Sequence, residues 1–209
     1  MEKLQQLASQ AVPIMNANID TDIITPMNRL TTRLAKPLAY YAFEPLRYIG
    51  GDGDSGNPDP DFPLNDPRYA GATIMLCGEN FGCGSSRESA PAAIAELGIR
   101  CVIGSSFGDI FFNNCFQQGV LPVVLPLREV ETLAAQAKEG GRFELDLEAQ
   151  LIVSPDGRRI PFEVNALKKR SLLEGLDDIS LTLQQDKEIA AFQERDRLAR
   201  PWIYDVRRD

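Results

Sequence analysis

Short apolar runs alternate with helix-like patterns through the middle of the chain. The runs have the length and content of buried strands, and the segments between them carry apolar residues at helical spacing. In chain order these are Ala72–Cys77 (strand), Glu88–Leu97 (helix), Arg100–Ile103 (strand), Phe107–Gln117 (helix) and Val120–Leu125 (strand). Gly98 and Gly119 stand where helix-ending glycines are common. This alternation predicts an α/β fold with a mostly parallel sheet and right-handed connections.

The flanking segments predict further elements around this centre. Leu4–Met15 is moderately apolar, and we expect an edge strand there. A helical pattern at Leu127–Lys138 stops at Gly140. The later elements are strands at Arg142–Leu147, Leu151–Val153 and Arg159–Val164, a helix capped by Asn165 and running to Leu176, and a strand at Ile179–Leu183.

The C-terminal residues 184–209 are predicted to form a charged amphipathic helix and a tail. In the helix Asp186–Leu198 we expect Ile189, Phe192 and Leu198 to face inward. The tail at Pro201–Tyr204 is aromatic and suits docking on the body or on a partner.

Two segments between the elements are predicted to be loops. Residues 50–67 hold many prolines, glycines and aspartates, which predicts a solvated, flexible loop. Pro26–Lys36 has no clear period and is expected to be a loop that reaches over a pocket. The length of 209 residues fits a single domain spanning residues 1–209.

The loop Gly78–Arg87 is the most distinctive stretch of the chain. It lies between a predicted strand and helix, so backbone N–H groups and a helix N-terminus point at one spot. Ser85, Ser86 and Arg87 add two hydroxyls and a fixed cation there. The pattern therefore predicts an anion pocket, suited above all to a carboxylate that a guanidinium grips with two hydrogen bonds. The alternative is a structural turn in which one of the serines caps the next helix.

Two phosphate-binding motifs do not fit this loop. It has no lysine for a Walker A motif, and Arg87 stands where the dinucleotide fingerprint needs a small residue. The next predicted loop, Gly104–Phe107, follows the neighbouring strand. We expect it to lie beside the loop Gly78–Arg87. We expect Ser105 or Ser106 to cap the helix that follows.

Composition narrows the function classes. The net charge of −8 argues against a nucleic-acid surface. No apolar run has the length of a membrane helix, and Met1–Gln10 has no secretory pattern, so we expect a cytoplasmic protein.

The chain contains no histidine, which excludes the Ser-His-Asp triad and histidine metal sites. The four cysteines match no zinc or iron–sulfur spacing, and we expect no cofactor on this chain alone.

Three long motifs resemble the small subunits of 3-isopropylmalate dehydratase, within the aconitase superfamily. They are Asn18–Pro26, Gly78–Glu88 and Ser106–Asn114, and Leu176–Leu183 is similar as well. The resemblance runs over nearly the whole chain. It implies a swivelling three-layer β/β/α domain that pairs with a large subunit, which would hold a 4Fe–4S cluster. It also implies a hydro-lyase that isomerises a small 2-hydroxy dicarboxylate by losing and regaining water.

The resemblance also implies roles for individual residues. Ser85 matches the base that removes a proton next to a substrate carboxylate. Arg87 matches the arginine that binds a substrate carboxylate, and Ser86 would add a hydrogen bond to it. Asp22 matches a carboxylate that a second loop brings to the site. Arg29 lies in the loop expected to contact the variable group of the substrate.

The chain departs from the family pattern at several positions. Ser89 stands where members usually have histidine, Arg29 where they often have an aromatic residue, and Leu46 where they tend to have tryptophan. An inward Arg29 suits a more acidic substrate, so hydratases acting on citraconate, dimethylmaleate or a homoaconitate-like acid are alternatives. Arg29 pointing to solvent is the other possibility. A third hypothesis is an anion-binding domain without catalytic activity.

Overall fold

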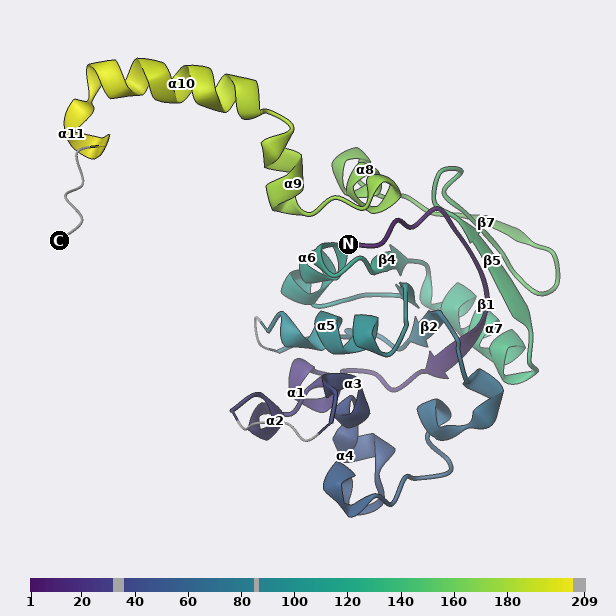
Figure 1. Ribbon diagram of the computed structural model, residues 1–209. Helices are drawn as coiled ribbons and strands as arrows, with labels where there is room; N and C mark the ends of the chain where they lie inside the picture. Colours follow the sequence, from purple (N-terminus) through teal and green to yellow (C-terminus); the bar gives the residue numbers. More distant parts are fainter. Residues whose placement is uncertain (32–35, 85–86, 205–209) are drawn as a thin grey trace.

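Seven strands form one curled, mixed sheet in the order β4-β3-β2-β1-β5-β6-β7 (Figure 1). The computed structural model describes residues 1–31, 36–84 and 87–204. The strands are β1 (Gln6–Ile14), β2 (Ile74–Cys77), β3 (Cys101–Gly104), β4 (Leu121–Val124), β5 (Arg142–Asp146), β6 (Leu151–Val153) and β7 (Arg159–Pro161). Strands β1 to β4 pair in parallel, and β5 to β7 continue the sheet in antiparallel fashion. The prediction of an α/β fold is confirmed.

Strand β1 joins the two halves of the sheet. Its second half pairs in parallel with β2, from Ala11 opposite Ile74 to Ile14 opposite Cys77. Its first half pairs with β5, from Gln6 opposite Asp146 to Gln10 opposite Arg142. The prediction of an edge strand was wrong, because β1 occupies the centre. Only its second half is continuously buried, which is why the whole segment has a moderate apolar content.

Helices cover the sheet and extend beyond it. They are α1 (Thr21–Ile24), α2 (Met27–Thr31), α3 (Leu38–Tyr41), α4 (Glu44–Arg47), α5 (Ser89–Glu96), α6 (Asp109–Gln117), α7 (Leu127–Lys138), α8 (Ala166–Glu174), α9 (Asp178–Leu183), α10 (Asp186–Ala199) and α11 (Pro201–Tyr204). Asn165 caps α8 as predicted. The predicted strand at Ile179–Leu183 was wrong: it is α9, because the Asp177 carboxylate accepts from the Ser180 N–H at 2.6 Å and starts a helix.

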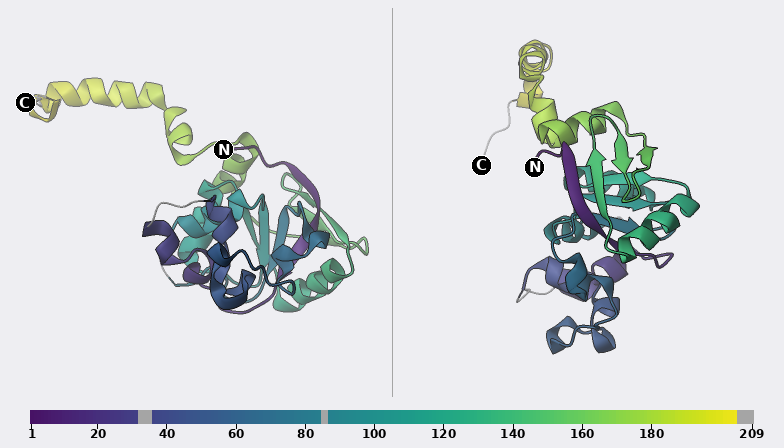
Figure 2. Two further views of the ribbon diagram at one scale, coloured as in Figure 1. Left: turned by 60° about the horizontal axis from the view of Figure 1, so that its bottom comes forward. Right: turned by 90° about the vertical axis from the view of Figure 1, so that its right-hand side faces the viewer.

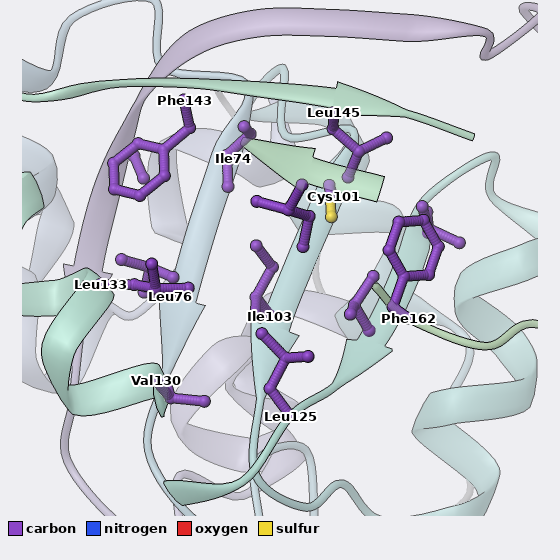
Figure 3. Packing of buried hydrophobic residues seen from close by; sticks show 14 of the residues in the cluster. Ile74, Leu76, Cys101, Ile103, Leu125, Val130, Leu133, Phe143, Leu145 and Phe162 are labelled. Carbon is purple, nitrogen blue, oxygen red and sulfur yellow. The ribbon is translucent and has the colours of Figure 1, made fainter. Parts of the chain in front are cut away.

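Two hydrophobic cores separate three layers. Ile74 and Leu76 of β2 face the antiparallel strands, where Phe143 and Leu145 point toward them (Figure 3). The alternate β2 residues Met75 and Cys77 face the opposite core, which includes apolar residues of α5 and α6. Both faces of the parallel strands are therefore buried, as their near-continuous apolar sequence predicts. The layers follow the predicted β/β/α order.

The segment between α4 and β2 has more local structure than its composition predicts. It contains 3₁₀ turns at Ile49–Gly51, Gly53–Ser55, Pro63–Asn65 and Pro67–Tyr69. The Asn65 side chain accepts from Arg47 Nε at 3.0 Å and donates to the Arg47 and Asp59 carbonyls at 2.7 and 2.8 Å. Short-range turns and one bridging amide thus hold this stretch of chain together, and its flexibility stays a prediction.

The last three helices extend away from the sheet (Figures 1 and 2). Phe192 and Leu198 of α10, predicted to face inward, are 53% and 86% exposed. That prediction was wrong, because α10 packs on no part of the described body. No helix in the described ranges is long and apolar enough to cross a membrane.

Candidate functional site

Three loops meet where β1, β2 and β3 end. The Gly82 N–H donates to the Ile19 carbonyl at 2.7 Å, and the Thr21 N–H donates to the Cys83 carbonyl at 2.9 Å. On the other side the Phe81 N–H donates to the Ser106 carbonyl at 3.1 Å. The backbone hydrogen bonds of the glycine loop are thus made with both neighbouring loops. This confirms that the loop after β3 lies beside the glycine loop.

The glycine loop lies directly on an aromatic ring. Gly82 has φ +71°, and a Cβ built there would be 2.2 Å from the Phe111 ring. A Cβ at Gly108 would lie 2.5 Å from the Gly82 carbonyl oxygen. Phe81 packs edge-on against Phe111 with ring centroids 5.5 Å apart. Glycine is required at both positions by close approach, and at Gly82 also by its left-handed backbone.

Replacing Gly82 with alanine is expected to lower the free energy of unfolding by about 3 kcal/mol or more, from overpacking added to backbone strain. Gly71→Ala is a matched control, because Gly71 has a similar φ of +77° but nothing within 4 Å of its Cβ position. The control should cost about 1 kcal/mol from backbone strain alone. Chemical denaturation measures both. Equal losses would show that Phe111 does not constrain the loop.

Asp22 and Arg87, predicted to share the site, are in direct contact. The Asp20 carboxylate accepts from the Ile23 N–H at 2.8 Å and starts α1, which carries Asp22. Arg87 Nη1 donates to Asp22 Oδ1 and also to the Thr25 carbonyl at 3.4 Å. The Arg87 side chain is 16% exposed, and that of Asp22 is 56% exposed. The Arg87 guanidinium is therefore held in place by Asp22, and the Asp22 carboxylate that pairs with it remains open to solvent.

The two predicted serines, Ser85 and Ser86, lie outside the described residues. Gly84, which precedes them, is close to the second loop, because a Cβ built there would be 3.5 Å from Asp20 Cβ. Helix α5 begins at Ser89 with Glu88 at its N-cap position, which differs from the capping role considered for the serines. Among the described residues, a hollow of about 240 Å³ is lined by Gly82, Gly84, Gly108, Asp109 and Ile110. It is smaller than typical small-molecule pockets.

Arg29 is held by acidic residues from the neighbouring segment. Its Nε donates to Glu44 Oε2 at 2.9 Å, its Nη2 donates to Glu44 Oε1, and its Nη1 donates to Asp54 Oδ2 at 2.6 Å. Asp52 Oδ1 lies 3.3 Å from Nη2, and the guanidinium carbon is 4.2 Å from the Tyr41 ring centroid. The Arg29 side chain is 12% exposed, so it does not point freely into solvent. Its role as a direct substrate ligand stays a prediction.

Glu44 is the buried member of this cluster. Its side chain is 3% exposed and also accepts from the Gly53 N–H at 2.7 Å. The Arg29 guanidinium lowers the pKa of the Asp54 carboxyl below its usual value, with help from the Tyr41 hydroxyl. Hydrogen bonding to Asp54 in turn raises the pKa of Tyr41. The cluster links α2, which follows the Asp22 helix, to α4, which begins at Glu44, and to the segment after α4.

Arg29→Ala is expected to lower the free energy of unfolding by about 3 kcal/mol, because it leaves the buried Glu44 carboxylate without its cation. Arg68→Ala is the matched control: the Arg68–Asp66 pair has a 64% exposed arginine side chain, so its loss should change little. Urea unfolding of both variants checks this. If Arg29→Ala unfolds like the control, the cluster does not stabilise the fold.

The sequence pattern missed two features of the site. Ser106 is not a helix cap, since Gly108 precedes α6; its hydroxyl instead accepts from the Asn80 N–H at 2.8 Å and joins two loops. Asp52 and Asp54, which contact Arg29, fall in the predicted solvated loop, and Glu44 lies before that loop. The one available signal was the concentration of aspartates after Gly50, but it did not indicate a partner.

The described residues offer no group of three side chains that could hold a metal. Cys77, Cys101 and Cys115 are buried, and burial raises the pKa of each thiol, which disfavours the thiolate that metals bind. Cys83 is partly exposed in the glycine loop, where it is a free cysteine. These residues do not fit an iron–sulfur cluster.

Sequence models of known families cover most of the chain. A model described as "Aconitase C-terminal domain" matches residues 1–128. A model described as LeuD_N matches residues 131–166. A third, which describes the C-terminal domain of the 3-isopropylmalate dehydratase small subunit, matches residues 178–206.

Curated relatives match over nearly the full length. A 3-isopropylmalate dehydratase small subunit from Parvibaculum lavamentivorans is 47% identical over 97% of this chain and 100% of its own length. One from Dinoroseobacter shibae is 49% identical with the same coverage. This chain belongs to the 3-isopropylmalate dehydratase small-subunit family. The members of this family are subunits of a dehydratase within the aconitase group.

A solved structure supports the fold assignment within this family. The crystal structure of a 3-isopropylmalate dehydratase from Methanocaldococcus jannaschii is 28% identical, with a TM-score of 0.62. The match covers 90% of this chain and 99% of that chain. The curled sheet with helices is therefore an architecture that this family shares.

Proposed function

We propose that this chain is the small subunit of a heteromeric hydro-lyase that interconverts 2-isopropylmalate and 3-isopropylmalate by dehydration and rehydration in leucine biosynthesis. The observation that carries the proposal is the pairing of Arg87 with Asp22, where three loops meet at the ends of parallel strands. Relatives of similar length, named as small subunits of this dehydratase, support it. We place the complex in the cytoplasm.

Ser85 is the base in this proposal. The reaction removes a proton from the carbon next to a substrate carboxylate, and Ser85 takes that proton as an alkoxide. Without any histidine in the chain, cations and backbone donors must activate the serine. Arg87, two residues along, favours loss of the serine proton through its charge.

Arg87 and Ser86 bind the substrate carboxylate. The planar guanidinium matches a carboxylate with two parallel hydrogen bonds, which fixes the orientation of the adjacent carbon. In the free chain Asp22 occupies part of the guanidinium. A substrate carboxylate would share or replace that contact, so Asp22 keeps Arg87 in place until substrate arrives.

The site is completed by a large subunit. The hollow beside the glycine loop is small, and the described cysteines do not fit a cluster, so we assign a 4Fe–4S cluster to the partner. Bound there, the cluster would supply a Lewis acid for the leaving hydroxyl. This chain contributes the base, Ser85, and the residues that bind the substrate carboxylate, Arg87 and Ser86.

Among the alternatives, hydratases acting on methylmalate, dimethylmalate or homoaconitate-type acids keep the same mechanism. Arg29 was the reason to consider them, and its guanidinium is already engaged by Glu44 and Asp54. We therefore favour isopropylmalate. An anion-binding domain without activity would need Arg87 but not two tandem hydroxyls.

The test is anaerobic co-expression with the large subunit, followed by dehydration assays on a panel of 2-hydroxy diacids. We expect the highest kcat/KM with isopropylmalate. Preference for a more acidic substrate would contradict the assignment to isopropylmalate. It would indicate that Arg29 selects the substrate. Tight binding of diacids without turnover would favour the binding domain.

A further inference from the structure

Glu44 is a carboxylate in the interior of the protein. In the part of the chain that the structure describes, it is the one charged residue among the buried polar side chains. Both of its carboxylate oxygens accept from the Arg29 guanidinium, and we call these two side chains the Arg29–Glu44 pair. A buried pair adds little net stability, because the cost of removing two charges from water offsets their attraction. Its two-point geometry instead fixes the distance and angle between the elements that carry it, here α2 and α4.

The backbone next to the Arg29–Glu44 pair is bonded to the residues on both sides of Thr25. The Phe43 N–H, directly before the glutamate of the pair, donates to the Ile24 carbonyl at 3.1 Å. The Arg29 N–H donates to the Pro26 carbonyl at 3.0 Å. The pair therefore ties together the two segments that hold Thr25 in its place.

Thr25 in turn contacts Arg87 and the helix that follows it. The Thr25 carbonyl accepts from Arg87 Nη1 at 3.4 Å, and the Thr25 hydroxyl donates to the Ser89 carbonyl at 3.4 Å. Asp22 accepts from the same Nη1. Helix α1 lies between α4 and α5, so it connects the two sides (Figure 1). Within the described ranges, the hydrogen bonds of the Arg87 guanidinium all end on residues 22–25.

We propose that the Arg29–Glu44 pair is a positioning pair for Arg87. It fixes residues 22–25 between α4 and α5, and through them it fixes the direction in which the Arg87 guanidinium faces the substrate carboxylate. The proposal rests on the proposed function, in which Arg87 binds that carboxylate. In this role Glu44 acts without touching the substrate, through a continuous series of hydrogen bonds and short rigid elements.

The first test observes Arg87 directly in the full-length free chain. The chain is labelled with nitrogen-15 arginine, and the Nε–Hε resonance of Arg87 is identified by its absence in Arg87→Lys. Glu44→Gln keeps the shape of the side chain but removes its charge, so the Arg87 resonance should shift. Glu174→Gln is the matched control, because Glu174 pairs with an arginine on the exposed surface of α8, and it should leave the Arg87 resonance in place.

A second variant covers the case in which Glu44→Gln does not fold. Arg29→Lys keeps a cation beside the Glu44 carboxylate but lacks the planar fork that contacts both of its oxygens. This variant should also shift the Arg87 resonance. An Arg87 resonance that stays at its wild-type position in a folded Glu44→Gln or Arg29→Lys chain overturns the proposal.

The second test is a double-mutant cycle in the complex with the large subunit. Glu44→Gln should lower kcat/KM by about fivefold when Arg87 is present, and by less than about twofold in the Arg87→Lys background. Loss of stability alone would act equally in both backgrounds, so the difference isolates the effect that passes through Arg87. Glu174→Gln should change kcat/KM by less than about twofold in either background. Equal losses from Glu44→Gln in the two backgrounds overturn the proposal.

The outcomes separate this proposal from the proposed function. An Arg87 resonance that depends on Glu44, in a chain whose complex does not convert isopropylmalate, would support the positioning pair and contradict the proposed function. A complex that converts isopropylmalate, with equal losses from Glu44→Gln in both backgrounds, would contradict the positioning pair and leave the proposed function standing.

Discussion

Replacing Ser85 with alanine is expected to abolish turnover and to leave assembly of the two subunits intact. Removing the base leaves no histidine that could take over proton removal, because the chain contains none. General acid–base catalysis typically contributes 10²–10⁴-fold, so kcat should fall by at least about 100-fold while KM changes little.

The measurement is steady-state kinetics of the complex assembled with each variant, with the Kd between subunits determined in parallel. Ser86→Ala is the matched control, since it loses one hydrogen bond to the substrate and not the base. It should raise KM more than it lowers kcat. Wild-type kcat in the Ser85→Ala complex would show that Ser85 is not the base.

Arg87→Lys is expected to lower kcat/KM by about 10-fold or more. Lysine keeps the positive charge but has no planar fork, so the carboxylate loses its two-point contact and its fixed orientation. The substitution should also weaken the contact with Asp22, whose partner in the free chain is Arg87 Nη1. Kinetics with substrate and equilibrium binding of a non-reactive diacid measure the effect.

Arg68→Lys provides the control for this exchange. Arg68 also pairs with an aspartate, but it lies in the 3₁₀ turn at Pro67–Tyr69 and is 64% exposed in its side chain. Its substitution should leave kinetics unchanged. Wild-type kinetics in the Arg87→Lys complex would show that Arg87 does not bind the substrate carboxylate through two hydrogen bonds.

Local sequence patterns predicted the central part of the fold because its signals are short-range. The buried strands, the helices between them and the glycines at Gly98 and Gly119 depend on neighbours within a few residues. The position of β1 in the sheet does not depend on neighbours of this kind. Its place between β2 and β5 is set by pairing with residues as distant as Asp146, which no local period indicates.

The C-terminal predictions failed for a different reason. The pattern predicts that apolar residues of α10 face this chain, but sequence periodicity identifies an apolar face and not what covers it. At Ile179–Leu183, a short apolar run is ambiguous between strand and helix, and the Asp177 cap decided it.

The site was predicted in part. Strand order placed the loop after β3 beside the glycine loop, and the hydrogen bonds between the two loops bear this out. The presence of Asp22 near Arg87 was implied by the family resemblance, and the two side chains are in contact. Their roles toward a substrate stay predictions. The acidic residues around Arg29 are separated from it by 15 to 25 positions and converge only through the fold. Long-range ion pairs of this kind leave no pattern in a single sequence.

The most direct test of the central claim is a titration of this chain into a fixed amount of cluster-loaded large subunit, measuring conversion of 2-isopropylmalate to 3-isopropylmalate. Our account predicts no conversion by either subunit alone, a rise to a plateau at equal amounts, and binding without conversion for Ser85→Ala. Conversion by the large subunit alone, or an equal plateau with Ser85→Ala, would show that this chain does not supply the catalytic base.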